Sequence, residues 1–93
     1  MNLRKAARGQ PCLIRLPCCS GDPETTVLCH YRLAGFSGMG MKSPDEFGAF
    51  GCDRCHAVVD GRAKLEGWTR AEIRLAHAEA VMRTQELLRR KVA

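Results

Sequence analysis

The feature that most constrains this chain is the pentapeptide Cys52-Asp53-Arg54-Cys55-His56, in which two cysteines stand at metal-ligand spacing and a histidine follows the second directly. A CxxC pair is typical of half a zinc site, of a redox dithiol or of ordinary core cysteines. With the added histidine it also matches the attachment motif of c-type haem, which needs export and a distant axial ligand, and neither is visible in the sequence. No thioredoxin-like βαβ pattern surrounds the pair, so we favour metal ligation.

The length of the chain indicates why a metal is needed. Its 93 residues predict a single domain, 1–93, near the lower limit of what one apolar core can support. Aromatic residues are only 5% of the chain, whereas there are six cysteines. Zinc bound by thiolates supplies about 10–16 kcal/mol in small domains. Disulfides are the alternative staple, but the basic N-terminal residues lack the apolar run of a secretion signal. We therefore expect a cytoplasmic protein with reduced thiols.

Charge indicates the kind of partner. The formal net charge is +5, and no segment approaches the roughly 20 apolar residues of a membrane span, so we expect no membrane contact. Basic residues crowd the two ends of the chain: Arg4, Lys5 and Arg8, then Arg83, Arg89, Arg90 and Lys91. This distribution favours a nucleic-acid partner, with DNA ahead of RNA, through phosphate contacts. The alternative is a solvated surface that only keeps the protein in solution.

Two segments predict strands. Residues 25–32 are β-branched and aromatic and predict a strand with His30 near its end, and residues 47–50 predict a short second strand. The glycine-rich stretch 35–51 otherwise predicts an irregular loop. Residues 1–10 predict a basic, weakly structured arm.

Two further segments predict helices. Residues 53–60 read as a short helix. Thr69 and Glu72 form a capping box, which predicts the start of a long C-terminal helix over residues 69–92. His77 lies beside the apolar stripe of that helix, which favours a histidine packed at the edge of a buried face over a ligand. The fold class is therefore α+β.

The cysteines predict a zinc site. Structural zinc takes four ligands in a tetrahedron, and Cys52 and Cys55 supply two of them. The front of the chain must supply the rest, through Cys12 and either Cys18 or Cys19. We favour Cys19, because Cys19-Ser20-Gly21 matches the ending of a zinc knuckle, where glycine relieves crowding near the thiolate. The predicted ligands of structural Zn²⁺ are thus Cys12, Cys19, Cys52 and Cys55, and Cys18 is spare.

A knuckle, a strand pair and a helix bearing the second cysteine pair give an order that resembles the HNH, or His-Me finger, endonucleases with a treble-clef zinc site. Val27–Arg32 takes the strand position and Cys52–His56 the helix position. The resemblance implies a small treble-clef, ββα-metal finger with an additional long C-terminal helix. Nearly the whole chain also resembles the small inferred nucleases of lambda-like prophages, through Leu3–Gly9, Asp22–Thr25 and Met82–Gln85.

The resemblance implies a mechanism and a set of site residues. His30 would be the general base that activates water, a role that suits an unperturbed pKa of about 6.5. His56 would bind one catalytic divalent ion, Mg²⁺ or Mn²⁺. Arg32 or Arg54 would bind a phosphate oxygen of the nucleic acid.

The sequence departs from that family at two points. Before the catalytic histidine the family commonly has an aspartate or histidine that helps to bind the ion, whereas this chain has Cys29, a soft ligand poorly matched to Mg²⁺. The family's middle asparagine has no match over residues 33–51, where Asp45 and then Glu46 are the nearest polar candidates.

These departures keep alternatives open. The chain could be a zinc finger that binds nucleic acid without cutting it, or a structural or protein-interaction domain that uses its C-terminal helix. His30 could be a structural histidine of the strand pair. His56 could replace a cysteine at the zinc, although adjacent helical residues such as Cys55 and His56 point about 100° apart, which favours separate roles.

Overall fold

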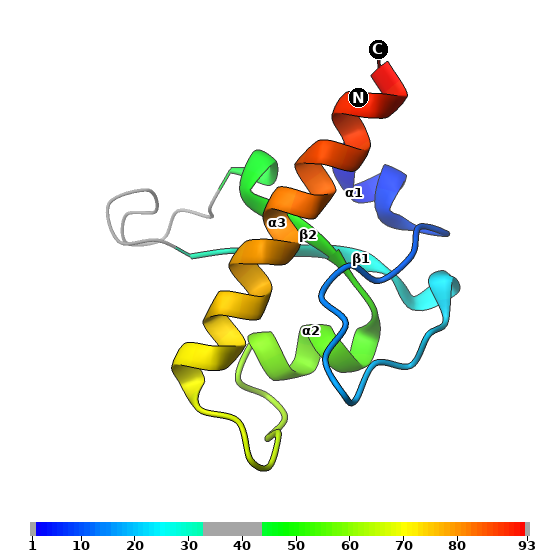
Figure 1. Cartoon of the computed structure of the whole chain (residues 1–93). Coiled ribbons are helices and arrows are strands. Elements are labelled where there is room, and N and C mark those ends of the chain that lie inside the picture. Colours follow the sequence, from blue (N-terminus) through cyan, green and yellow to red (C-terminus); the bar gives the residue numbers. More distant parts are fainter. Residues whose placement is uncertain (1, 33–43, 93) are drawn as a thin grey trace.

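The structure is a computed structural model that describes residues 2–32 and 44–92 (Figure 1). Its elements in chain order are α1 (Leu3–Ala7), the 3-10 turn η1 (Pro23–Thr25), β1 (Val27–His30), the 3-10 turn η2 (Asp45–Phe47), β2 (Gly48–Gly51), α2 (Asp53–Val59) and α3 (Arg70–Val92). The two-stranded sheet and the long C-terminal helix confirm the predicted α+β class. No helix among these residues is long and apolar enough to cross a bilayer.

The sheet is a short antiparallel pair in which Val27 lies opposite Gly51 and His30 opposite Gly48. Both glycines are required by close packing. A Cβ atom at residue 48 would lie 2.5 Å from Leu28 Cγ, and one at residue 51 would lie 2.5 Å from Ile14 Cδ1. The two predicted strands are therefore present, the first shorter than expected. Residues 35–43 of the predicted irregular loop lie outside the described residues. The remainder of that stretch forms η2 and β2.

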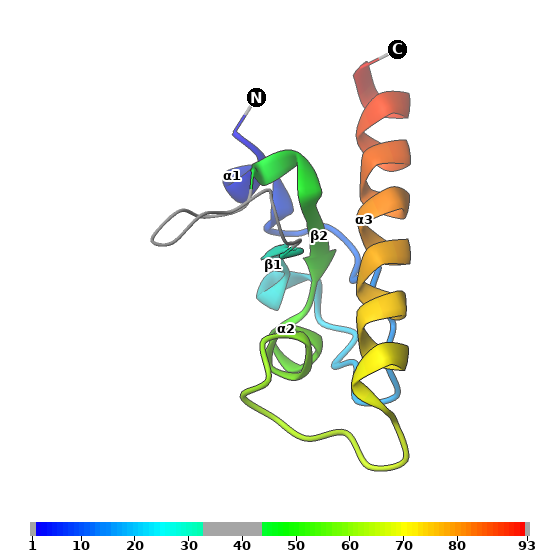
Figure 2. The same ribbon diagram turned by 90° about the vertical axis from the view of Figure 1, so that its left-hand side faces the viewer.

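The long helix α3 packs along β2, while α1 and α2 lie near opposite ends of the sheet (Figure 2). The predicted capping box is present at its start: the Glu72 N–H donates to Thr69 Oγ1 at 3.1 Å, and the Thr69 N–H donates to Glu72 Oε1 at 2.8 Å. The buried face of α3 comprises Ile73, His77, Ala80, Val81 and Thr84.

The first ten residues differ from the prediction, because residues 3–7 form the helix α1. Its N-cap is Asn2, whose Oδ1 accepts from the backbone N–H groups of Arg4 and Lys5 at 3.1 and 3.2 Å. Ala7 is fully buried and joins the hydrophobic core. The sequence interpretation weighed the charges of this segment and overlooked its capping asparagine.

Thr84 joins α3 to the sheet through a buried hydrogen bond. Its Oγ1 accepts from the Phe50 N–H at 3.0 Å and donates to the Ala80 carbonyl at 2.8 Å. We expect Thr84→Val to lower the free energy of unfolding by about 1–3 kcal/mol, because the buried Phe50 N–H loses its acceptor. Thr84→Ser keeps the hydroxyl and should be the more stable variant in denaturant titrations. Equal stability of Thr84→Val and wild type would contradict this role.

Candidate metal centre and histidine pocket

Four cysteines from two distant segments meet beside the start of α2. The sulfur atoms of Cys12, Cys19, Cys52 and Cys55 all lie within 4.8 Å of one another, and those of Cys19 and Cys52 are 3.7 Å apart. Tetrahedral zinc with bonds of about 2.3 Å separates its sulfur ligands by roughly 3.8 Å. The cluster therefore has the dimensions of a site that can hold a metal ion such as zinc. It comprises the four cysteines predicted as ligands, so the structure brings that set together.

The local backbone directs N–H groups at these sulfurs. Cys52 is the N-cap of α2, and its Sγ accepts from the Cys55 N–H at 3.5 Å and from the Ser20 N–H at 3.4 Å. On the other side, Arg15 has a φ of 58°, a left-handed conformation that turns the chain tightly after Cys12. Hydrogen-bond donors of this kind stabilise the thiolate form that metals bind.

The pKa values of the thiols in the cluster are shifted in opposite directions. Hydrogen bonding with the Cys55 thiol lowers the pKa of Cys12 to about 4. The same contact, together with burial, raises the pKa of Cys55. Burial raises the pKa of Cys19 to about 11. Four thiolates at this spacing therefore need a compensating positive charge, which a divalent cation supplies.

The two remaining cysteines lie outside this cluster. Cys18 precedes a cluster member but is not part of it, as predicted from the choice of Cys19. Cys29 is only 1% exposed, and its Sγ lies 3.8 Å from the Val27 carbonyl oxygen and 4.0 Å from that of Gly51. Burial raises the pKa of Cys29 to about 12. Cys29 is therefore a neutral core thiol. It does not take the place of the ion-binding residue that the HNH family has before its catalytic histidine.

His30 ends β1 and is paired with a carboxylate. Its Nε2 lies 2.7 Å from Asp45 Oδ1, and the same oxygen lies 3.6 Å from Arg4 Nε. The hydrogen bond with His30, and then the charge of Arg4, lower the pKa of Asp45. Asp45 is therefore ionised at neutral pH and accepts the Nε2 hydrogen; in the neutral form of the ring the lone pair then lies on Nδ1. Asp45 was the nearest polar candidate in the sequence, and the structure brings it into direct contact with His30.

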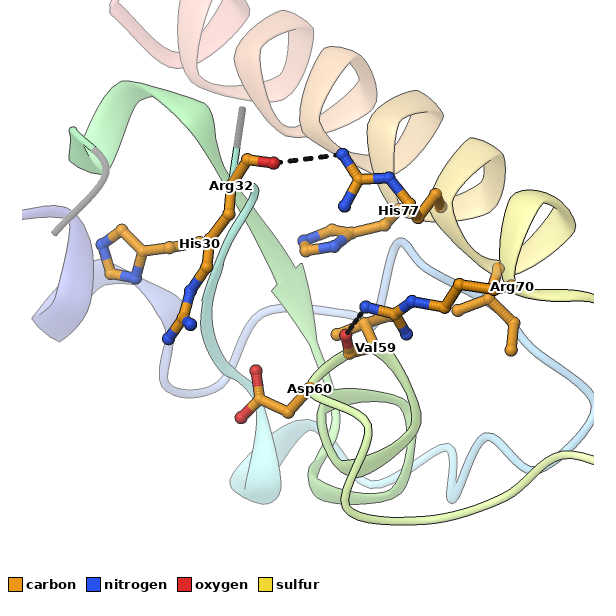
Figure 3. A pocket seen from close by; sticks show the side chains of 8 residues that line it. His30, Arg32, Val59, Asp60, Arg70 and His77 are labelled. Carbon is orange, nitrogen blue, oxygen red and sulfur yellow. Dashed lines mark hydrogen bonds between the residues drawn. The ribbon is translucent and has the colours of Figure 1, made fainter. Parts of the chain in front are cut away.

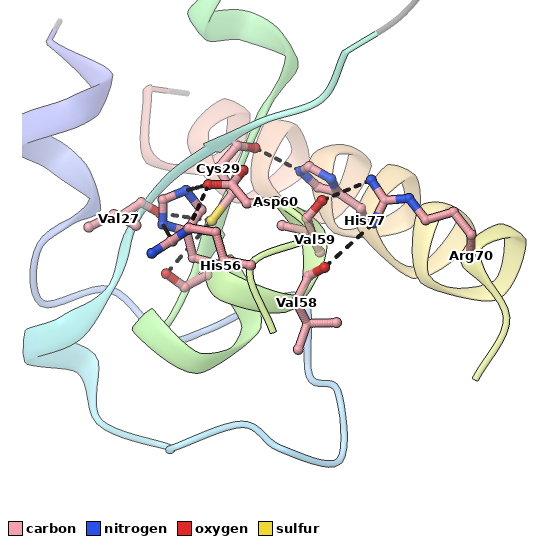
Figure 4. A network of polar contacts seen from close by, with 10 residues as sticks. Val27, Cys29, His56, Val58, Val59, Asp60, Arg70 and His77 are labelled. Carbon is pink, nitrogen blue, oxygen red and sulfur yellow. Dashed lines mark hydrogen bonds and ion pairs between the residues drawn. The ribbon is translucent and has the colours of Figure 1, made fainter. Parts of the chain in front are cut away.

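His56 lies on α2, outside the group of four sulfurs, and faces Asp60 (Figure 4). Its Nε2 is 3.1 Å from Asp60 Oδ2, and its Nδ1 is 3.4 Å from a guanidinium nitrogen of Arg62. Sequence reasoning did not single out Asp60. The signal was available, since residues four apart share one face of a helix.

A small pocket of about 80 Å³ lies between the end of β1, the C-terminal end of α2 and the helix α3 (Figure 3). Its polar lining comprises His30, Arg32, Asp60, Arg70, Arg74 and His77. Three guanidinium groups against one carboxylate make the pocket cationic, which suits an anionic group such as a phosphate. Of the two arginines predicted to contact nucleic acid, Arg32 lines the pocket and Arg54 does not.

These features define a small, cysteine-rich α+β protein with a cationic, histidine-bearing pocket. The family profile described as "Putative nuclease YbcO" matches residues 1–92, and the chain belongs to this family. Membership supports a nuclease function, and the predicted similarity to a family of small inferred nucleases is confirmed, with one relative from a bacterium and one from a phage.

Individual relatives agree with this assignment. The chain is 44% identical to "Putative nuclease YbcO" of Escherichia coli (strain K12) and to "Putative nuclease ybcO" of Enterobacteria phage 82. Each alignment spans 84 residues and covers 77% of this chain and 88% of the relative. The fold is similar to the solved "Structure of a putative bacteriophage protein from Escherichia coli str. K-12 substr. MG1655", with a TM-score of 0.76 and 35% identity, covering 97% of this chain and 100% of that one.

The cysteine cluster leads to a direct prediction. We expect the purified protein to contain one zinc ion per chain by elemental mass spectrometry, and Cys12→Ser or Cys55→Ser to lose it and unfold at a lower temperature. Cys18→Ser is the matched control and should retain zinc. Loss of zinc in Cys18→Ser with retention in Cys19→Ser would instead assign Cys18 as the ligand.

Proposed function

We propose that this chain is a metal-dependent endonuclease of the HNH type that hydrolyses phosphodiester bonds in nucleic acid, with DNA the preferred substrate. The observation that carries the proposal is the 2.7 Å contact between His30 and Asp45 at the edge of a cationic pocket. Membership of a family described as putative nucleases supports the same reaction class.

His30 is the general base in this proposal. The ionised Asp45 holds the hydrogen on Nε2, so that Nδ1 is the nitrogen that takes a proton from the attacking water. The hydrogen bond with His30, and then the charge of Arg4 at 3.6 Å, lower the pKa of Asp45. The side chain of His30 is 21% exposed, so water can reach it.

His56 and Asp60 would together hold the catalytic divalent ion, Mg²⁺ or Mn²⁺. Their Nε2 and Oδ2 atoms are 3.1 Å apart. Adjacent ligands of an octahedral ion, with bonds of about 2.1 Å, are roughly 3.0 Å apart, so the pair fits. The carboxylate oxygen of Asp60 also suits a hard cation better than the buried sulfur of Cys29. When bound, the ion would supply positive charge to the phosphate and to the departing oxygen.

Arg32 is proposed to bind a phosphate oxygen. Its side chain lines the pocket, and among the described residues no side chain pairs with its guanidinium. Arg54 lies away from the pocket and is proposed to contact nucleic acid further along the substrate. The zinc held by the four cysteines would be structural, in a treble-clef arrangement that ties the residue 12–19 loop to the start of α2 and thereby sets the position of His56.

One observation favours a second function. Both ring nitrogens of His56 already have protein partners, Asp60 and Arg62. If these contacts persist with nucleic acid bound, the protein would be a zinc finger that binds nucleic acid without cutting it.

The proposed base is tested by incubating the protein with supercoiled plasmid in Mg²⁺ or Mn²⁺. We expect nicking that His30→Ala lowers by about 10²- to 10⁴-fold, with Asp45→Asn intermediate because the asparagine no longer stabilises a charged imidazole. Unchanged zinc content and unfolding temperature of each variant provide the control. Plasmid binding without nicking by the wild-type protein would support the second function and reject the first.

The proposed ion site is tested separately through Asp60. We expect Asp60→Asn to raise the Mn²⁺ concentration for half-maximal nicking by roughly tenfold or more, because a charged ligand is lost. Asp53→Asn removes the same charge at the other end of α2 and should leave this concentration unchanged. An equal response of the two variants would show that Asp60 acts only through net charge.

A further inference from the structure

The end of β1 is held against α3 by contacts on both sides of His30. Before it, the Cys29 carbonyl oxygen lies 2.8 Å from His77 Nε2 (Figure 4). After it, the Arg32 carbonyl oxygen accepts from a guanidinium nitrogen of Arg74 at 3.0 Å (Figure 3). The backbone that carries His30 is therefore bonded to α3 one residue upstream and two residues downstream.

Tyr31 adds ring contacts to the same two side chains of α3. The guanidinium carbon of Arg74 lies 4.6 Å from the centroid of the Tyr31 ring, a cation–π distance. The His77 ring meets Tyr31 edge-on, with centroids 5.0 Å apart and an interplanar angle of 71°. Because Arg74 and His77 are three residues apart, they occupy one face of α3 and contact the strand end together.

The hydrogen-bond chemistry of His77 is well defined. A carbonyl oxygen can only accept, so the Nε2 of His77 carries the hydrogen that Cys29 receives. Burial, and then the nearby charge of Arg74, lower the pKa of His77, while the carbonyl contact opposes the shift. The ring is therefore a neutral donor at physiological pH, buried at 6% exposure.

His30 itself contacts a different partner. Its imidazole pairs with Asp45, whereas the residues around it pair with α3. The next residue, Tyr31, donates its N–H to the Phe47 carbonyl oxygen at 3.0 Å. A strand of only four residues is thus secured from two directions at the point where the imidazole emerges.

We propose that His77 and Arg74 are positioning residues, which hold the backbone at the end of β1 so that His30 meets Asp45 at the border of the pocket. The inference rests on the proposed role of His30 as the base. It assigns α3, which lies outside the ββα part of the fold, a direct share in building the site.

The test uses His77, because its buried ring is neutral, whereas the charge of Arg74 in the pocket could act on the substrate directly. We expect His77→Ala to speed amide hydrogen exchange at Tyr31 by about tenfold or more, and to lower kcat for plasmid nicking by about 10- to 100-fold with KM nearly unchanged, since small displacements of a catalytic group are costly. His77→Gln, whose amide can donate to the Cys29 carbonyl, should restore most of both. Thr84→Val is the control, because it weakens the attachment of α3 to Phe50 and leaves residues 29–32 untouched.

The outcomes separate this inference from the proposed function. If His77→Ala changes Tyr31 exchange and kcat no more than Thr84→Val does, or if exchange rises while kcat stays unchanged, the positioning role is wrong. If the wild-type protein binds plasmid but does not nick it, the proposed function fails, and catalytic positioning fails with it. In that case an effect of His77→Ala on amide exchange at Tyr31 alone would show that His77 has only a structural role.

Discussion

The approach of four sulfurs to within 4.8 Å is the contact on which the rest of the structure depends. It joins the residue 12–19 loop to the junction between β2 and α2, two segments that are also linked by the hydrogen bond from the Leu13 N–H to the Phe50 carbonyl oxygen at 2.7 Å. α2 begins at Cys52, so the direction of that helix follows from the position of the cluster. His56 and Asp60 are carried by this helix and its C-cap, and their placement follows in turn. A chain with so few aromatic residues has a small core, so the cluster is a major support of α2, beside the hydrogen bonds from Arg70 to the Val58 and Val59 carbonyl oxygens.

Features of the fold that depend on neighbouring residues could be read from the sequence. The CxxC spacing and the Thr69–Glu72 capping box act over three residues, and both appear in the structure where they were expected. The helix α1 was missed for two reasons: its capping residue Asn2 was overlooked, and the burial of Ala7 depends on a core that the sequence does not display. Local chemistry was predictable, whereas the benefit of tertiary packing was not.

The site was predictable to a smaller degree, because its contacts join residues far apart. His30 and Asp45 are 15 residues apart, and nothing in their spacing indicates a hydrogen bond. The interpretation of His77 as a packed histidine is right about its burial and did not include its polar contact. Its partner is a backbone carbonyl 48 residues away, and every residue has such a carbonyl, so no sequence pattern marks this contact.

Two histidine–carboxylate pairs with similar surroundings lie within residues 2–32 and 44–92, and position distinguishes them. His30 pairs with Asp45 beside Arg4, and His56 pairs with Asp60 beside Arg62. Charge alone therefore cannot separate a base from an ion ligand. Asp60, however, also lines the pocket that His30 borders, and it is the only carboxylate among the described residues that line it.

A bare phosphate in this pocket would be attracted by the three guanidinium groups and repelled by Asp60. When the phosphate binds together with a divalent cation, the Asp60 carboxylate can bind the cation, so it is attracted to the pair instead of repelling the phosphate. The pocket is thus better matched to a phosphate with its cation than to the phosphate alone. This complementarity favours the cutting of nucleic acid over its binding, since binding requires only the arginines.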